Sequence, residues 1–342
     1  MKKKFLVGKT NLGEGSLMQN SITFEKWEGF DSIRIFNSEI GMRFLPELGC
    51  KIAQVTDLAD EFEWLWRDSS RPYKRRNFAD RFDEHDISGF DECFPNIGIS
   101  PNPEDLTSQL PDHGELWCQP WVTEIVDGSI ISNVESQLFN YSFQRTVKLN
   151  ERKISFEYEI RNRSSRALMG FWSAHPLFNV SENMRIEISG NPQMTKEFGF
   201  SGRLGNDGVD GYEGHLDPYI WPFTLGSDGL TRDLSIVSLV NPITDKVVLR
   251  SPEDGRVAIF DPASNHRLEI EFDSFDLPYL GICFNLGAYP KTGVQGRWLA
   301  IEPSSGATDR LDEAVGLGLK AIRPGEVQRW STTWHLGSQS KH

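Results

Sequence analysis

Short segments in which apolar and polar residues alternate recur along the whole chain, and they constrain its fold more than any other feature. The clearest covers residues 153–161, where apolar side chains at 154, 156, 158 and 160 alternate with polar ones. This period of two is typical of a β-strand with one buried face. Further segments of this kind, separated by turn-forming clusters of Gly, Pro, Asn and Asp, lie at residues 32–36, 184–188, 256–260, 267–272 and 327–334.

The number of these segments favours an all-β protein. Only residues 312–316 carry a helical pattern, and so short a segment cannot organise a domain. No low-complexity linker, repeat or long charge run divides the 342 residues, so we expect a single domain over residues 1–342. An open sheet of this size would expose long edges, whereas two stacked sheets or a closed barrel would not. We predict the simpler solution, a large antiparallel β-sandwich.

The charge balance restricts the partners of the chain. Lysine and arginine number 36 against 49 aspartates and glutamates, which gives a formal net charge of −13. Such a charge repels the phosphates of nucleic acids and the anionic surface of a membrane. No run of about 20 apolar residues is long enough for a membrane helix. We therefore expect no nucleic acid and no membrane partner, and a neutral or cationic small molecule as ligand.

The cysteines and the N-terminus favour the cytoplasm. The basic N-terminus meets polar residues before any apolar run of useful length, so we expect no signal peptide. The cysteines are widely spaced, form no C-x-x-C pair and lie in largely apolar surroundings, which suits reduced, buried thiols. They are Cys50, Cys93, Cys118 and Cys283. The sequence leaves the oligomeric state open between a monomer and a homodimer.

Two ionisable residues lie in apolar segments that read as strands. His175 stands among aromatic and apolar residues in 171–179, and an imidazole there is a candidate acid or base near neutral pH. Taken alone, the segment favours a core histidine bonded to backbone. Glu302 follows the apolar run 298–301, and burial raises the pKa of a carboxyl group towards the range of a general base. A salt-bridged residue at a strand end is the alternative.

Other segments mix ionisable side chains with Gly, Pro or Trp, a composition that indicates a concave site. Residues 89–96 contain Asp91 and Glu92, and residues 111–117 contain His113 and Trp117. Trp172, close to His175, and Trp117 are candidates to stack against a ligand. The alternatives are that the two acids cap a turn, that His113 is a turn residue, and that the tryptophans belong to the core.

The sequence predicts no metal and no cofactor. No two histidines are spaced as a metal-ligating pair such as H-x-x-x-H. The glycines of 202–208 lack the spacing, the Gly-Lys pair and the following helix of a phosphate-binding loop. The basic run 71–76 is a candidate to hold an anionic substituent, although a solvated loop is the favoured interpretation.

Taken in order, these segments resemble the aldose 1-epimerase family, also called galactose mutarotases. Residues 45–53 are similar to an early strand of that family, and residues 322–330 are similar to its closing Pro-Gly-Glu turn and last strand. A His-Gly pair falls where His113 and Gly114 stand, a second histidine in a segment ending with Phe-Asn falls at His175, and a late glutamate falls at Glu302. The resemblance implies the family's large antiparallel β-sandwich, called a supersandwich.

The resemblance also implies roles for these residues. Glu302 would be the general base that removes the proton of the anomeric hydroxyl, and His175 would be the general acid that protonates the ring oxygen. His113 would hold the ring oxygen or a neighbouring hydroxyl. Ring opening, rotation next to the aldehyde and reclosure would exchange the anomers of a small carbohydrate, and this chemistry requires no cofactor.

Two departures from the family's pattern leave the sugar open. Many members carry an arginine upstream of the first histidine, whereas residues 89–96 contain none, which implies a divergent branch with different hydroxyl contacts. The substrate-binding aspartate of the family has its match at Asp245, although Lys246 replaces the histidine that usually follows, and Asp217 is a competitor. The departures also leave two other functions open. These are a non-catalytic carbohydrate-binding or sensing protein on the same fold, and another sugar isomerase or lyase.

Overall fold

The computed structural model describes residues 20–198, 200, 203–204, 220–291 and 293–338, and these form two packed antiparallel sheets and two short hairpins. In spatial order the larger sheet contains β1 (Ser21–Trp27), β2 (Phe30–Phe36), β3 (Ile40–Leu45), β4 (Lys51–Asp57), β6 (Phe90–Cys93), β13 (Ser173–Asn179), β22 (Arg297–Ser304), β21 (Tyr279–Leu286), β18 (Thr244–Arg250) and β15 (Met194–Phe198), with β5 (Phe62–Glu63) paired to β4.

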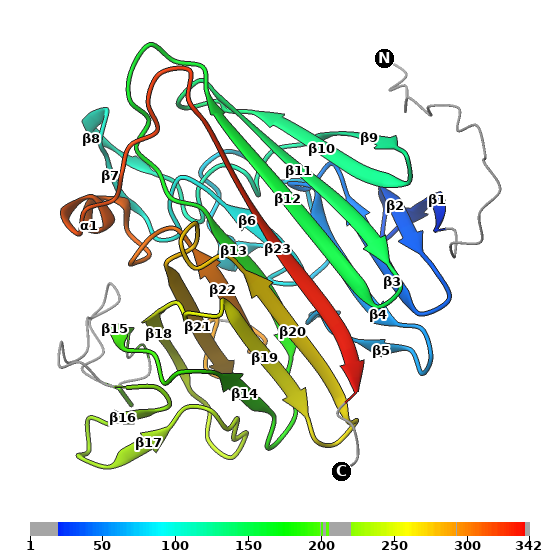
Figure 1. The fold of residues 1–342 in the computed structure, drawn as a ribbon, viewed down its shortest axis with the longest axis vertical. Helices are drawn as coiled ribbons and strands as arrows, with labels where there is room; N and C mark the ends of the chain where they lie inside the picture. Colours follow the sequence, from blue (N-terminus) through cyan, green and yellow to red (C-terminus); the bar gives the residue numbers. More distant parts are fainter. Residues whose placement is uncertain (1–19, 199, 201–202, 205–219, 292, 339–342) are drawn as a thin grey trace.

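The second sheet contains, in spatial order, β14 (Arg185–Ile188), β19 (Arg256–Asp261), β20 (His266–Phe272), β23 (Val327–Ser338), β12 (Lys153–Asn162), β11 (Tyr141–Asn150), β10 (Ser129–Glu135) and β9 (Val122–Val126). Figure 1 looks onto this sheet, which runs from β9 and β10 at the upper right to β14 at the lower left. The hairpins are β7 (Ser100–Asn102) with β8 (Asp105–Leu110), and β16 (Phe223–Leu225) with β17 (Thr231–Asp233).

The inner faces of the two sheets meet in one apolar layer. Phe90 of β6 stacks on Trp334 of β23 with ring centroids 5.5 Å apart, and Phe178 of β13 contacts the same indole. The apolar side chains of β12 that alternate in the sequence, Phe156 among them, point into this layer. Face-to-face packing of this kind confirms the predicted all-β sandwich.

The helical content is small. Within the described residues the one α-helix is α1 (Leu311–Gly316), as expected for residues 312–316, and a 3₁₀ turn, η1, covers Phe82–Glu84. The described residues include no helix that is long and apolar enough to cross a membrane.

The middle of the larger sheet is covered on its outer face as well. Phe82 of η1 and Trp117, which lies in the segment after β8, pack against Leu177 of β13 and against Trp298 and Ala300 of β22. The central strands are therefore buried on both faces, and β13 has buried residues at every position from 173 to 178. The candidate site lies on this covered outer face.

Candidate active site

His175 and Glu302 lie on neighbouring strands and point to the same outer face of the larger sheet. The antiparallel register of β13 and β22 pairs Leu177 with Ala300, which brings residue 175 opposite residue 302. The imidazole Nε2 lies 3.7 Å from the carboxylate Oε1. The two side chains are only 6% and 1% exposed, so water has little access to either. The structure thus brings together the two residues that the sequence predicted as catalytic.

A lysine contacts the other oxygen of the same carboxylate. Lys246 of β18 forms an ion pair with Glu302 Oε2, and its Nζ also lies 2.7 Å from Asp309 Oδ1. Lys246 is 4% exposed, so both contacts are shielded from water. Opposite charges in such surroundings interact more strongly than at the surface. Glu302 therefore has one oxygen engaged by Lys246 and one that faces His175.

His113 lies beside His175, on the segment that follows β8. The two imidazole centroids are 4.7 Å apart in an edge-to-face arrangement, and Phe82 stacks on His113 at 4.2 Å. Asp112 fixes both neighbours, because its Oδ1 lies 2.8 Å from His113 Nδ1 and its Oδ2 accepts the Phe82 backbone N–H at 2.9 Å. This arrangement leaves His113 Nε2 for another partner.

The two imidazoles experience different electrostatic surroundings. Burial lowers the pKa of His175 well below its ordinary value, and the charges of His113, Lys246 and Lys51 add to this effect. No carboxylate oxygen is within hydrogen-bonding distance of His175 among the described residues, and its Nδ1 has no partner there. His175 is thus neutral, whereas His113 has a carboxylate partner.

Glu302 and Asp112 also differ in their titration. Burial raises the pKa of Glu302, and the ammonium group of Lys246 opposes this effect. For Asp112 burial acts in the same direction, but His113 and the hydrogen bonds outweigh it and hold the pKa below its ordinary value. Such perturbed groups, close together on one face, are typical of catalytic sites.

Asp91 lies directly beside His175 in the sheet but belongs to a buried ion cluster. It is the register partner of His175, on β6. Its carboxylate lies 2.5 Å from Lys51 Nζ and 3.1 Å from an Arg76 nitrogen, and the same two cations contact Asp86. Arg76 was predicted within a basic, solvated loop or as an anion-binding residue. It is buried instead, because two carboxylates neutralise it.

Glu92 and Trp172 lie on the inner side of the larger sheet. Successive residues of a strand point to opposite faces, so Glu92 faces away from its neighbour Asp91. Its carboxylate accepts hydrogen bonds from Arg145 at 2.9 Å and from the Trp172 indole at 2.8 Å. Burial raises the pKa of Glu92, and Arg145 opposes that effect. Glu92 and Trp172 therefore lie on the opposite side of the larger sheet from His175 and Glu302.

The other predicted ligand contacts are distributed around the site. Trp117 is completely buried, its indole N–H donates to Asp112 O at 2.9 Å, and it packs edge-to-face against Phe82. Trp117 thus packs against Phe82, which stacks on His113. Asp245 is buried next to Lys246 and pairs with Arg203 at 2.6 Å. Asp217 lies outside the described residues.

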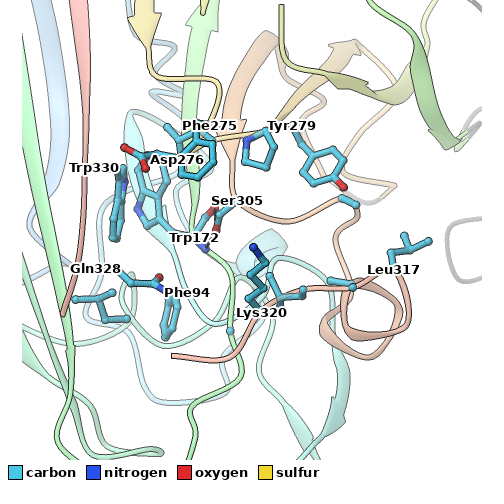
Figure 2. Close-up of a pocket in the computed structure, with 18 of the residues that line it drawn as sticks. Phe94, Trp172, Phe275, Asp276, Tyr279, Ser305, Leu317, Lys320, Gln328 and Trp330 are labelled. Carbon is cyan, nitrogen blue, oxygen red and sulfur yellow. Dashed lines mark hydrogen bonds between the residues drawn. The ribbon is translucent and has the colours of Figure 1, made fainter. Parts of the chain in front are cut away.

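A separate cavity of about 460 Å³ opens at one end of the sandwich. Figure 2 shows Trp172 and Trp330 on one side of it, Tyr279 and Phe275 along the top, and Lys320 below. Ser305, the residue after β22, also lines it, whereas neither His175 nor Glu302 does. The cavity is therefore distinct from the group of His175, Glu302, Lys246 and His113 on the outer face. Trp172 belongs to its wall.

Several residues of the site were not predicted from the sequence. Lys246 was noted only as a departure from a family pattern, and Asp309 and Phe82 lie in segments without a strong motif. Asp112 directly precedes His113, so a signal for an Asp-His pair was present in the sequence. The described part of the chain contains no group of three or more His, Cys, Asp or Glu side chains that could hold a metal ion. The four cysteines are free and buried, as expected.

No protein-family model matches the chain, and no curated protein matches its sequence. Solved structures do match. A galactose mutarotase-like protein from Clostridium acetobutylicum has a TM-score of 0.66 at 17% identity, covering 94% of this chain and 99% of that chain. A galactose mutarotase-like protein from Lactobacillus casei has a TM-score of 0.61 at 17% identity, covering 90% and 100%.

A galactose mutarotase related enzyme from Lactobacillus acidophilus gives a TM-score of 0.65 at 14% identity, covering 91% of this chain and 99% of that chain. At identities this low, the TM-scores show a shared fold alone. The chain thus has the galactose mutarotase-like β-sandwich along nearly its whole length.

Proposed function

We propose that the chain is a sugar isomerase of the mutarotase type, which interconverts the α and β anomers of an aldose. The observation that carries this proposal is the pair of His175 Nε2 and Glu302 Oε1, 3.7 Å apart on neighbouring strands. Mutarotation removes a proton from one oxygen of the anomeric carbon and delivers a proton to the other. A carboxylate beside two neighbouring imidazoles offers a proton acceptor for one oxygen and a proton donor for the other.

In the proposed reaction Glu302 Oε1 accepts the proton of the anomeric hydroxyl. The bond between the anomeric carbon and the ring oxygen breaks, and that oxygen receives a proton from an imidazole. Rotation about the bond next to the aldehyde and the reversed steps close the other anomer. His175 is the closer imidazole to Glu302, and His113, paired with Asp112, is the one with a carboxylate to stabilise a proton. We assign His113 to deliver the proton to the ring oxygen and His175 to hydrogen-bond a neighbouring oxygen of the sugar.

The first test is Glu302→Gln. We expect the variant to bind sugar but to lose about 10²–10⁴-fold in the rate of mutarotation, because the amide cannot accept the proton. Polarimetry on freshly dissolved anomers of hexoses, pentoses, deoxysugars and sugar phosphates measures this rate. Glu157→Gln, an exposed glutamate of β12 paired with Lys148, is the control and should retain the wild-type rate. Equal rates in wild type and Glu302→Gln across the panel would refute the mechanism.

A second candidate function is carbohydrate binding without turnover. The neutral state of His175 favours it, because the family resemblance implies this imidazole as the proton donor and a neutral imidazole is a weak one. Calorimetric binding of a sugar without faster exchange of its anomers would select this function. Appearance of a new stable product in NMR spectra would select another sugar isomerase or a lyase. Residence in the cytoplasm and a monomeric or dimeric state stay predictions from the sequence.

A further inference from the structure

Lys246 reaches Glu302 across an intervening strand. Lys246 lies on β18 and Glu302 on β22, and β21 pairs with both of them. The lysine side chain therefore spans one strand to place its ammonium between Glu302 and Asp309. A buried lysine held between two acids on the face of a catalytic pair calls for an explanation beyond packing.

Gly281 makes this contact possible. It lies on β21 directly opposite Glu302 in the register. A Cβ at this position would lie 2.7 Å from Glu302 Oε2 and 3.3 Å from Lys246 Cε. Any larger residue would thus enter the space that the ion pair occupies. The backbone of Gly281 is not in the left-handed region, so the absence of a side chain serves space and not conformation.

A buried lysine beside Glu302 can act as a nucleophile or as a fixed positive charge, and the surroundings of Lys246 distinguish between these roles. A buried lysine with a lowered pKa could attack the open-chain aldehyde to form a Schiff base. Here burial alone would lower the pKa of Lys246, but Asp309 and Glu302 outweigh it and hold the pKa above its ordinary value. The group is therefore an ammonium ion, which has no lone pair for attack and acts on Glu302 through its charge.

We propose that Lys246 is a positioning residue that keeps Glu302 ionised and engages its Oε2, so that Oε1 is presented to the substrate. This inference rests on the proposed function, since it assigns the base of that reaction. The titratable and charged groups around Glu302 are Lys246 of β18, Asp309 of the segment after β22, His175 of β13, His113, Cys93 of β6 and Cys283 of β21. Of these, Lys246 and Asp309 act on Glu302 in opposite directions.

The opposite signs make the inference testable with two single substitutions. In Lys246→Met the opposing cation is lost, so the pKa of Glu302 rises further and the carboxylate is protonated at higher pH. The acid limb of the kcat/KM profile should move up by about one to three pH units. In Asp309→Asn a competing negative charge is lost, and the acid limb should move to lower pH. Lys246→Arg keeps the charge and should lie closer to wild type than Lys246→Met does.

The measurement is the pH profile of mutarotation for wild type and the three variants. A parallel titration of the Glu302 carboxyl by infrared difference spectroscopy, assigned with Glu302→Gln, requires no turnover. Shifts of opposite sign in Lys246→Met and Asp309→Asn support the inference. Unshifted carboxyl titration in both variants overturns it, and if Lys246→Met fails to fold, Asp309→Asn alone decides by its direction.

The two proposals fail separately. A wild-type protein that accelerates no sugar in the panel refutes the proposed function, while the infrared titration still tests the control of Glu302 by Lys246. If the wild type is active but neither substitution shifts the acid limb or the carboxyl titration, the proposed function holds and Lys246 has no role in it.

Discussion

At the scale of single residues, the two neighbouring histidines differ in what surrounds them. His175 is buried against Phe82 and lacks a carboxylate partner at hydrogen-bonding distance within the described chain, whereas His113 Nδ1 lies 2.8 Å from Asp112. A carboxylate beside an imidazole fixes its tautomer and stabilises the imidazolium form. The structure thus gives a carboxylate partner to His113 and not to His175, whereas the family resemblance implied His175 as the acid.

Asp112→Asn tests this division of roles. We expect the rate of mutarotation to fall at least about tenfold near neutral pH, because His113 loses the carboxylate that orients its imidazole. Asp80→Asn is the matched control, since Asp80 forms a similar pair with His85 at 2.9 Å outside the contacts of His175. Equal rates for both variants and wild type would return the donor role to His175.

The proximity of candidate residues was predictable where each of them lies in a short, recognisable segment. His113, His175 and Glu302 each lie in a segment with a recognisable order, and the structure brings them together. Lys246 contacts Glu302 from a distant part of the sequence, and only the pairing of β18, β21 and β22 makes them neighbours. Asp309 lies seven residues after Glu302, and its ion pair is with Lys246. A single sequence carries no local signal for such contacts.

At the scale of elements, alternation revealed the strands with one exposed face. β12 has the predicted period of two in its burial, while β6 and β13 are buried at successive positions because loops cover their outer faces. Residues 89–96 therefore read as a polar site and not as a strand. Asp91 and Glu92 point to opposite faces of β6. Asp91 belongs to the ion cluster with Lys51, and Glu92 pairs with Arg145 of the other sheet.

The segment that carries His113 depends on Gly114. Its φ is +70°, and a Cβ there would lie 2.2 Å from the backbone oxygen of Phe94, the residue after β6. Gly128, at φ +75°, has no atom within 4 Å of its hypothetical Cβ. Gly128→Ala should cost about 1–2 kcal/mol from the left-handed backbone alone. Gly114→Ala adds a clash, so it should cost more in urea unfolding and slow mutarotation by displacing His113. Equal unfolding costs would show that the close approach is absent.

At the scale of the whole molecule, one buried ion pair joins the two sheets. Arg145 of β11 donates to Glu92 of β6 at 2.9 Å, and Arg145 also donates to Cys50 O. Both side chains are completely buried. Neither the partner nor its distance was predictable, because the pairing depends on how the two sheets stack, which local patterns do not specify. The overall sandwich was predictable, because the strand count and the need to bury one face of each strand led to it.

This pair separates a structural role of Glu92 from the substrate contact that the sequence suggested. Glu92→Met leaves the guanidinium of Arg145 buried without its carboxylate, which should lower the free energy of unfolding by about 3–5 kcal/mol. Glu92→Met with Arg145→Met removes both charges and should recover much of that loss, although Trp172 still lacks its acceptor. Urea unfolding of the single and double variants measures the recovery. Because Glu92 faces the inner layer, the double variant should keep the KM of the wild type. A raised KM in a folded double variant would instead place Glu92 in contact with the sugar, and would require the outer-face site to extend through the sheet.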